Sequence, residues 1–183
     1  MIIKKDKSII QNYFEDNSGV RGSNADFVAV AETEDDIPSF LSEMSKANTP
    51  VTIAGALTGN TASGLAFGGA VLSLEKLNQI GEIEKINDNN AVITVQAGAK
   101  TNDIKLKACS AGWMYPPDPT EKNASIGGNI STNASGGRGF KFGATRDYVK
   151  ALKVVFSDGS ISFVERGKYF ADGNGAITFK ALT

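Results

Sequence analysis

Two glycine-rich stretches contain the residues best suited to chemistry, and the first spans residues 54–69 (AGALTGNTASGLAFGG). It combines five glycines and three hydroxyl side chains with no charged residue. Successive backbone N–H groups in such a loop form a concave nest that suits a phosphate. A mobile surface loop is the alternative interpretation when such a loop occurs alone.

The second stretch covers residues 115–149 and is dominated by small and polar side chains. It opens with residues 116–119 (PPDP), which predict a rigid corner, and passes through Gly127 and Gly128. Small residues allow a backbone to approach another backbone or a ligand closely. This composition predicts a surface shaped around a partner, although Gly127 and Gly128 would equally serve close packing of a helix on a sheet.

Charged residues in this second stretch are open to two interpretations. Arg138, Lys141 and Arg146 would contact phosphate or form a solvated rim. Asp147 would anchor a turn or touch a ribose. The residue types alone do not choose between these roles.

The complete absence of histidine limits the chemistry of the chain itself. It excludes imidazole metal sites, Ser-His-Asp and Cys-His triads, and histidine general bases. If the protein performs a reaction, a cofactor or a partner must supply much of it. We therefore assign no catalytic residue and no metal site. The single cysteine, Cys109, is expected to be a buried small hydrophobe.

The bulk composition indicates an ordinary globular protein of 183 residues, enough for one domain or two small lobes. Its 19 basic and 20 acidic side chains nearly cancel, so nothing points to nucleic acid. No apolar run is long enough to span a membrane, and the N-terminus does not resemble a signal peptide. One cysteine cannot form an internal disulfide, and we expect a cytoplasmic protein.

The hydrophobic pattern predicts a small parallel α/β lobe over residues 1–80. A helix is expected at residues 7–15 and another at residues 33–47, the latter begun by Thr33 and Asp36 in an arrangement close to a capping box. Strands are expected at residues 26–31, 51–53 and 70–74. The first glycine-rich loop would then leave the carboxyl end of a strand, where ligands of such sheets bind.

A mainly antiparallel α+β lobe is predicted over residues 81–183. One hairpin is expected around the turn at residues 87–90, and another around Asp158-Gly159. Between them, Thr101 would cap a helix that runs to Ala111, with Gly112 just past its end. On that helix, Lys105 and Lys107 are expected to be solvated.

Several motifs in order resemble one known family. They are IAGALTGNTASGLAFGG (53–69), AVITVQAGAKTNDI (91–104) and YPPDPTEKNASIGGNISTNASGGRGFKFGATRDYV (115–149). Together they are similar to the FAD-binding domain of the vanillyl-alcohol oxidase (PCMH-type) superfamily. The nearest group is the flavin-dependent glycolate and D-lactate dehydrogenases. The resemblance covers roughly residues 26–165 and implies an α+β PCMH-type fold that binds FAD.

The resemblance also implies a bipartite FAD site. In the first loop the implied residues are Gly55, Ala56, Leu57, Thr58, Gly59 and Asn60. In the second segment they are Pro117, Asp118, Ser125, Gly127, Gly128, Asn129, Thr132, Asn133, Ala134 and Ser135, with Asn129 and Asn133 at the flavin ring edges. Gly143, Asp147 and Val149 would lie near the adenosine half.

Two departures from the family pattern bear on function. Residues 54–58 (AGALT) replace the usual Arg-Gly-Gly-Gly-Thr, and Leu57 is unfavourable if that position needs a positive φ. The family's later "GSEGTLGI" segment and its substrate cap domain are absent from the sequence. We therefore expect the isolated chain to bind FAD weakly or not at all and to be inactive.

The resulting hypothesis is an FAD-binding module of a D-2-hydroxy acid dehydrogenase or oxidase. Hydride would pass to flavin N5, and a cap domain or partner subunit would supply the site for the 2-hydroxy acid. Two alternatives stay open: an enzyme like UDP-N-acetylenolpyruvoylglucosamine reductase, and a scaffold or subunit of the same fold that has lost FAD.

Overall fold

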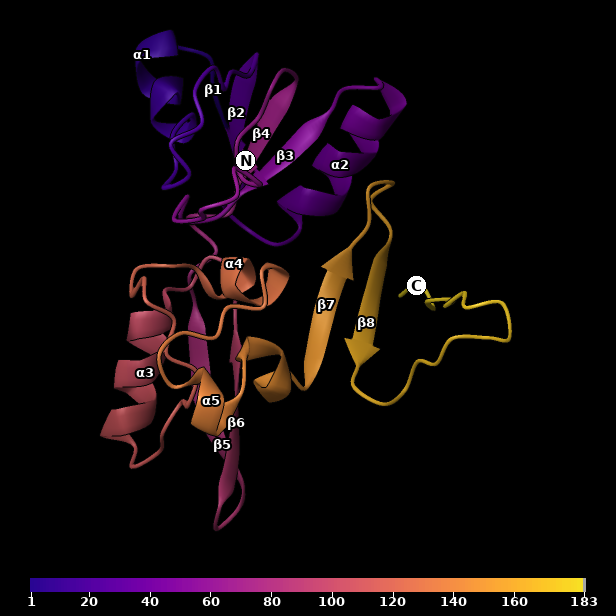
Figure 1. Ribbon diagram of the computed structural model, residues 1–183. Coiled ribbons are helices and arrows are strands. Elements are labelled where there is room, and N and C mark those ends of the chain that lie inside the picture. Colours follow the sequence, from indigo (N-terminus) through magenta and orange to yellow (C-terminus); the bar gives the residue numbers. More distant parts are fainter. Residues whose placement is uncertain (183) are drawn as a thin grey trace.

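The computed structural model describes residues 1–182 and places a mostly parallel sheet above two separate β-hairpins (Figure 1). The upper elements are β1 (Ile2–Lys4), α1 (Lys7–Ile10), the 3₁₀ helix η1 (Gln11–Tyr13), β2 (Phe27–Val30), α2 (Asp36–Lys46), β3 (Val51–Ala54) and β4 (Ala70–Ser73). The lower elements are β5 (Ile80–Asn87), β6 (Asn90–Val95), α3 (Thr101–Ser110), α4 (Ile126–Ser131), α5 (Gly139–Phe142), the 3₁₀ helix η2 (Thr145–Tyr148), β7 (Ala151–Val155) and β8 (Ile161–Glu165).

The upper sheet has four strands in the order β1-β2-β4-β3. Strands β2, β3 and β4 run parallel, with Val28 beside Val71 and Ile53 beside Leu72, whereas β1 is antiparallel to β2. The predicted parallel α/β arrangement is confirmed, with β1 as an added edge strand. The boundary at residue 80 stays a prediction.

Helices cover both faces of this sheet because its side chains alternate in direction. Val28 and Val30 pack with Ile10 and Tyr13 of the N-terminal helices. Ala29 and Leu72 pack on the other face with Phe40 of α2. The sheet is therefore a rigid base for the loop that leaves β3.

Helix α2 begins three residues later than the sequence predicts, and Asp36 organises its start. The Asp36 carboxylate accepts hydrogen bonds from the backbone N–H groups of Glu32 and Thr33, at 2.8 and 3.2 Å. The Met1 ammonium lies 2.8 Å away. This ammonium, followed by the two N–H groups, lowers the pKa of Asp36 to about 2. Thr33 thus donates through its backbone and does not cap the helix.

The lower part contains both predicted hairpins, β5–β6 and β7–β8. Helix α3 begins after Lys100, so Thr101 is its first residue and not its cap. The Thr101 hydroxyl instead donates to the Ala124 carbonyl at 3.0 Å. Gly112 ends the helix with φ +76°, as predicted. Cys109 lies on the exposed side of α3, so the prediction that it is buried was wrong.

The two parts of the chain meet at Glu34. Its carboxylate accepts from Lys153 of β7 at 2.9 Å and from the Gln96 amide at 3.3 Å. Nearby, a Cβ on Gly159 at the β7–β8 turn would collide with the Pro38 carbonyl of α2. We call the Glu34–Lys153–Gln96 contact the Glu34 clasp, because it joins the turn just before α2 to β7 and to the residue that follows β6.

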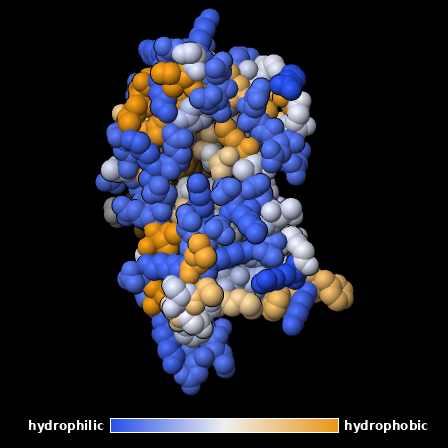
Figure 2. Space-filling view, turned by 90° about the vertical axis from the view of Figure 1, so that its left-hand side faces the viewer, coloured by the Kyte–Doolittle hydropathy of each residue, from blue (hydrophilic) through white to orange (hydrophobic). Residues whose placement is uncertain are grey.

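The face of the molecule that carries α1 and α3 is mostly hydrophilic, with apolar side chains gathered in separate patches (Figure 2). Among residues 1–182, no helix has both the length and the apolar character needed to cross a bilayer.

Candidate FAD-binding site

The first glycine-rich loop leaves β3 after Ala54 and offers an array of unpaired backbone donors. Within residues 1–182, the N–H groups of residues 56–64 find no protein acceptor. The loop is held from below by Leu65, which is 5% exposed, and by the fully buried Ala66. An uncharged, donor-rich loop on a fixed base has the chemistry of a diphosphate cradle.

Two residues in this loop adopt a backbone conformation that normally favours glycine. Leu57 has φ +52° and Ala62 has φ +57°. Such a conformation costs a residue with a Cβ about 1 kcal/mol or more. The Leu57 side chain packs against the buried cluster that includes Val28 and Val71. The unfavourable φ expected at Leu57 is therefore present, and burial of its side chain offsets part of the cost.

The two glycine-rich stretches meet where Gly55 contacts Ser125. A Cβ on Gly55 would overlap the Ser125 hydroxyl oxygen. Ser125 is 3% exposed, and its hydroxyl accepts from the Gly128 N–H at 3.3 Å, which caps α4. Only a glycine at position 55 lets the first loop pass this close to the start of α4.

The neighbouring glycines at 127 and 128 have different roles. Gly127 donates to the Ala97 carbonyl at 2.8 Å, and a Cβ on it would lie 2.9 Å from that oxygen. Gly128 is exposed and meets only the Ser125 hydroxyl at 3.1 Å. Gly127 therefore serves packing, and Gly128 leaves open surface beside the first loop.

The two asparagines expected at the flavin ring lie in different surroundings. Asn129 is 4% exposed, and its amide donates to the Thr101 hydroxyl at 2.5 Å. Asn133 has φ +50°, and its side-chain oxygen accepts from the Arg146 N–H at 3.2 Å. The amide nitrogen of Asn133 has no acceptor among residues 1–182. Of the two, Asn133 keeps a free donor for a ligand.

Residues 143–149 form a turn that is tied to the second segment. Asp147 accepts from the Ala144 N–H at 2.8 Å, and a Cβ on Gly143, which has φ +80°, would collide with the Asp147 carboxylate. Thr145 is buried and donates to the Ala134 carbonyl at 2.6 Å. Asp147 thus anchors a turn, one of the two roles that the sequence left open.

The PPDP corner is rigid because both neighbours of Asp118 are buried prolines. A Cβ on Gly136 would overlap the Asp118 carbonyl, so the corner and the Gly136 turn pack backbone to backbone. The Asp118 carboxylate forms an ion pair with Lys105 and lies 3.5 Å from Arg138 Nε. The hydrogen bond from Lys105 is the main reason that the pKa of Asp118 is lowered.

Lys105 and Lys107 are not simply solvated, as expected from the sequence. Lys105 pairs with Asp118, and Lys107 lies 2.8 Å from Glu82. Both partners are more than ten residues away along the chain, so no local pattern announced them. Lys105 was the main charged residue near the expected site that sequence reasoning missed.

The expected site residues differ in how far they are open to a ligand. The exposed ones are Ala56, Asn60, Gly128, Thr132, Ser135 and Asp147. The partly exposed ones are Gly55, Leu57, Thr58, Gly59, Asp118, Gly127, Asn133, Ala134, Gly143 and Val149. The buried ones are Pro117, Ser125 and Asn129, which support the others.

The fold and the loop chemistry define an α+β flavoprotein domain of the PCMH type, and comparison with known proteins agrees. The chain resembles 6-hydroxy-D-nicotine oxidase from Arthrobacter nicotinovorans in fold, with a TM-score of 0.76 at 15% identity over 91% of this chain and 36% of that one. It is 37% identical to a D-lactate dehydrogenase of Anaerostipes hadrus over 84% of this chain and 32% of the relative. It is 40% identical to glycolate oxidase subunit GlcD of Bacillus subtilis over 76% of this chain and 29% of the relative.

Residues 25–164 match the FAD binding domain family, and the chain belongs to that family. Its cofactor is FAD. The uncharged cradle of unpaired N–H groups fits the diphosphate of this cofactor. The chain spans about a third of the length of the curated relatives that it matches.

Proposed function

We propose that this chain is the FAD-binding part of a dehydrogenase that oxidises small D-2-hydroxy acids. The main support is the contact between Gly55 and Ser125. This contact joins the loop that carries the unpaired N–H groups to the second segment, so that the two form one continuous surface. Similarity to a D-lactate dehydrogenase and a glycolate oxidase subunit supports the substrate class. These relatives also favour a 2-hydroxy acid over the substrate of a UDP-N-acetylenolpyruvoylglucosamine reductase.

Within this proposal, the residues of the chain bind and orient the cofactor. Bound FAD would supply the acceptor for the hydride that leaves the α-carbon of the substrate. Backbone N–H groups of residues 56–60 hold the diphosphate, because they lack protein acceptors in residues 1–182. Gly128, Thr132, Asn133, Ala134 and Ser135 line the second half, and Gly143, Asp147 and Val149 border the adenosine. Pro117, Ser125 and Asn129 are buried and support the residues that face the cofactor.

The base that removes the hydroxyl proton is not assigned to any residue of this chain. The sequence has no histidine, and the carboxylate of Asp118 near the site forms an ion pair with Lys105. An engaged carboxylate with a lowered pKa is a poor base near neutral pH. We place the base in the cap domain or partner subunit that also holds the substrate.

A titration with FAD tests the cofactor site directly. Amide NMR spectra of the chain are recorded while FAD is added to millimolar concentration, and shifts are expected at residues 55–60 and 125–135. Because the chain carries only part of the site in this proposal, we expect binding that is lost on desalting. Shifts confined to other residues, or none at all, contradict the proposed site.

A matched pair of variants separates the cradle from the fold. Gly59→Val places a side chain in the loop where only Asp16 lies nearby, 3.9 Å from the new Cβ. It should weaken FAD binding at least about tenfold, because it blocks charge-assisted hydrogen bonds to phosphate. Gly173→Val in the exposed tail meets no atom of residues 1–182 within 4 Å of the new Cβ and should leave FAD binding unchanged.

An FAD-free scaffold is the second candidate, and the positive φ values at Leu57 and Ala62 favour it. It predicts a colourless chain that takes up no flavin at any concentration and co-purifies with a larger subunit. Oxidation of 2-hydroxy acids by this chain alone would contradict both candidates, because neither places the reacting base here.

A further inference from the structure

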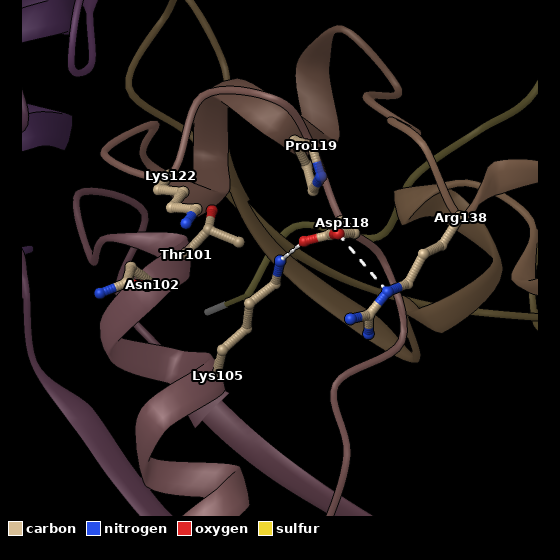
Figure 3. A pocket seen from close by; sticks show the side chains of 7 residues that line it. All are labelled: Thr101, Asn102, Lys105, Asp118, Pro119, Lys122 and Arg138. Carbon is tan, nitrogen blue, oxygen red and sulfur yellow. Dashed lines mark hydrogen bonds and ion pairs between the residues drawn. The ribbon is translucent and has the colours of Figure 1, made fainter.

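A charged cavity lies beside the PPDP corner, on the side of α3. Its volume is about 260 Å³, and in Figure 3 Lys105 of α3 and Arg138 of the Gly136 turn reach toward Asp118 of the corner. The lining residues are Thr101, Asn102, Lys105, Asp118, Pro119, Lys122 and Arg138. It shares only Asp118 with the residues assigned to FAD.

The cavity carries an excess of positive charge. Three cations, Lys105, Lys122 and Arg138, surround the single carboxylate of Asp118. Asp118 pairs with Lys105 and lies 3.5 Å from Arg138 Nε, and the nearby cations hold its pKa below the ordinary value. Because the carboxylate is ionised at neutral pH, the lining has a net charge of about +2.

The cavity also has donors that no protein group uses. Within residues 1–182, Lys122 forms no ion pair, and Arg138 engages Asp118 through Nε alone. The two terminal nitrogens of Arg138 form no hydrogen bond within that part of the chain, and a guanidinium fork can bind carboxylate or phosphate through two hydrogen bonds. The backbone N–H groups of Thr101 and Asn102 are already satisfied by Ala124 and Lys122 carbonyls.

We infer that this cavity binds a small dianion bearing carboxylate or phosphate groups, at a site separate from FAD. The volume suits a ligand of a few heavy atoms and is below the range of larger cofactor pockets, which begins at about 300 Å³. Arg138 and Lys122 supply the free donors, and Asp118 keeps Lys105 and Arg138 in place while the site is empty. Asp118 therefore competes with the ligand for Arg138.

This competition predicts that removing a cation and removing the Asp118 charge change the affinity for the dianion in opposite directions. Lys122→Gln and Arg138→Gln each remove a donor and should weaken dianion binding about tenfold. Asp118→Asn removes the competing charge and should strengthen it severalfold. A purely structural ion pair would make all three changes neutral or harmful to binding.

The experiment is an amide NMR titration of the whole chain with malonate and, separately, with inorganic phosphate, at constant ionic strength set by chloride. Shifts are expected at residues 101–105, 118–122 and 136–138, and they should persist with FAD present. Lys46→Gln on α2, in the other part of the chain, is the control and should change nothing. Lys122 is exposed and forms no ion pair within residues 1–182, so its variant should fold normally.

Several results would overturn the inference. No saturable shift with either anion, equal weakening by Lys46→Gln, weaker binding after Asp118→Asn in a folded protein, or displacement of the anion by FAD would each do so. A response to malonate alone identifies a carboxylate ligand, and a response to phosphate alone identifies a phosphate ligand.

Discussion

The two glycine-rich segments face the same candidate site but are built in different ways. In the 54–69 loop the backbone N–H groups of residues 56–64 lack acceptors within residues 1–182, and two residues with side chains adopt positive φ. In the 115–149 segment, glycines such as Gly127 and Gly136 press backbone against backbone. The N–H groups of the first segment stay available for a ligand. The second segment uses many of its hydrogen-bonding groups to stabilise its own conformation.

The largest effect should come from breaking the second segment at Gly136. Gly136→Ala combines φ +78° with a Cβ that overlaps the Asp118 carbonyl, so it should lower the free energy of unfolding by about 2 to 4 kcal/mol. Gly137→Ala, one residue later in open space, should change it by less than about 0.5 kcal/mol. Urea denaturation of both variants makes the measurement, and equal losses would show that the corner is not packed as described.

The junction of the two segments should respond next. Gly55→Ala collides with the Ser125 hydroxyl, and it should destabilise the protein by about 1 to 3 kcal/mol. Ser125→Ala alone removes the cap of α4 and should cost about 1 kcal/mol. In the double variant the new Cβ would meet only Ser125 Cβ at 3.6 Å, an ordinary contact.

A double-mutant cycle of these two changes therefore measures whether Gly55 and Ser125 are in contact. The double variant should be less harmful than the sum of the single ones by about 1 kcal/mol. Additive losses would mean that Gly55 and Ser125 do not touch, and the proposed continuous surface would lose its support.

Two substitutions of Leu57 should have a smaller effect on stability, and their order of stability should be unusual. Leu57→Ala removes packing and keeps the unfavourable φ, whereas Leu57→Gly removes packing and relieves it. The glycine variant should therefore be more stable than the alanine variant by about 1 kcal/mol, the reverse of the usual ranking. Thermal unfolding of the pair decides the point, and a more stable alanine variant would contradict the positive φ.

The smallest effect should come from the Glu34 clasp, which joins the upper and lower parts. Glu34→Gln should lower the free energy of unfolding at neutral pH by a few tenths of a kcal/mol, because the pair is partly exposed. Lys153 donates to Glu34 and lowers the pKa of its carboxyl below the ordinary 4.5. The contribution is thus complete above that value and is lost as pH falls through the lowered pKa.

Unfolding of wild type and Glu34→Gln across the acid range tests this sign. The two proteins should converge as the pH falls through the folded pKa of Glu34. A difference that grows in acid would show that Glu34 does not act as an ionised partner of Lys153.

Local patterns predicted much of the fold, because they report on one element at a time. The short apolar run of β2, the spacing of Ile37, Phe40 and Leu41 in α2, and the turn at Gly159 each depend on near neighbours in the chain. The start of α2 was misplaced because Asp36 receives its hydrogen bonds through its side chain, from N–H groups outside the helix. Cys109 was misplaced because α3 has a weak apolar pattern and exposes that side.

Motifs that each lie within one stretch of the chain were enough to indicate the FAD binding domain family and the α+β fold, and they predict the two segments expected to face the cofactor. Three features emerge only from the folded chain: which glycines pack and which stay open, the burial of Asn129, and the ion pair between Lys105 and Asp118. Those outcomes depend on contacts between residues far apart in the chain, which no local pattern encodes.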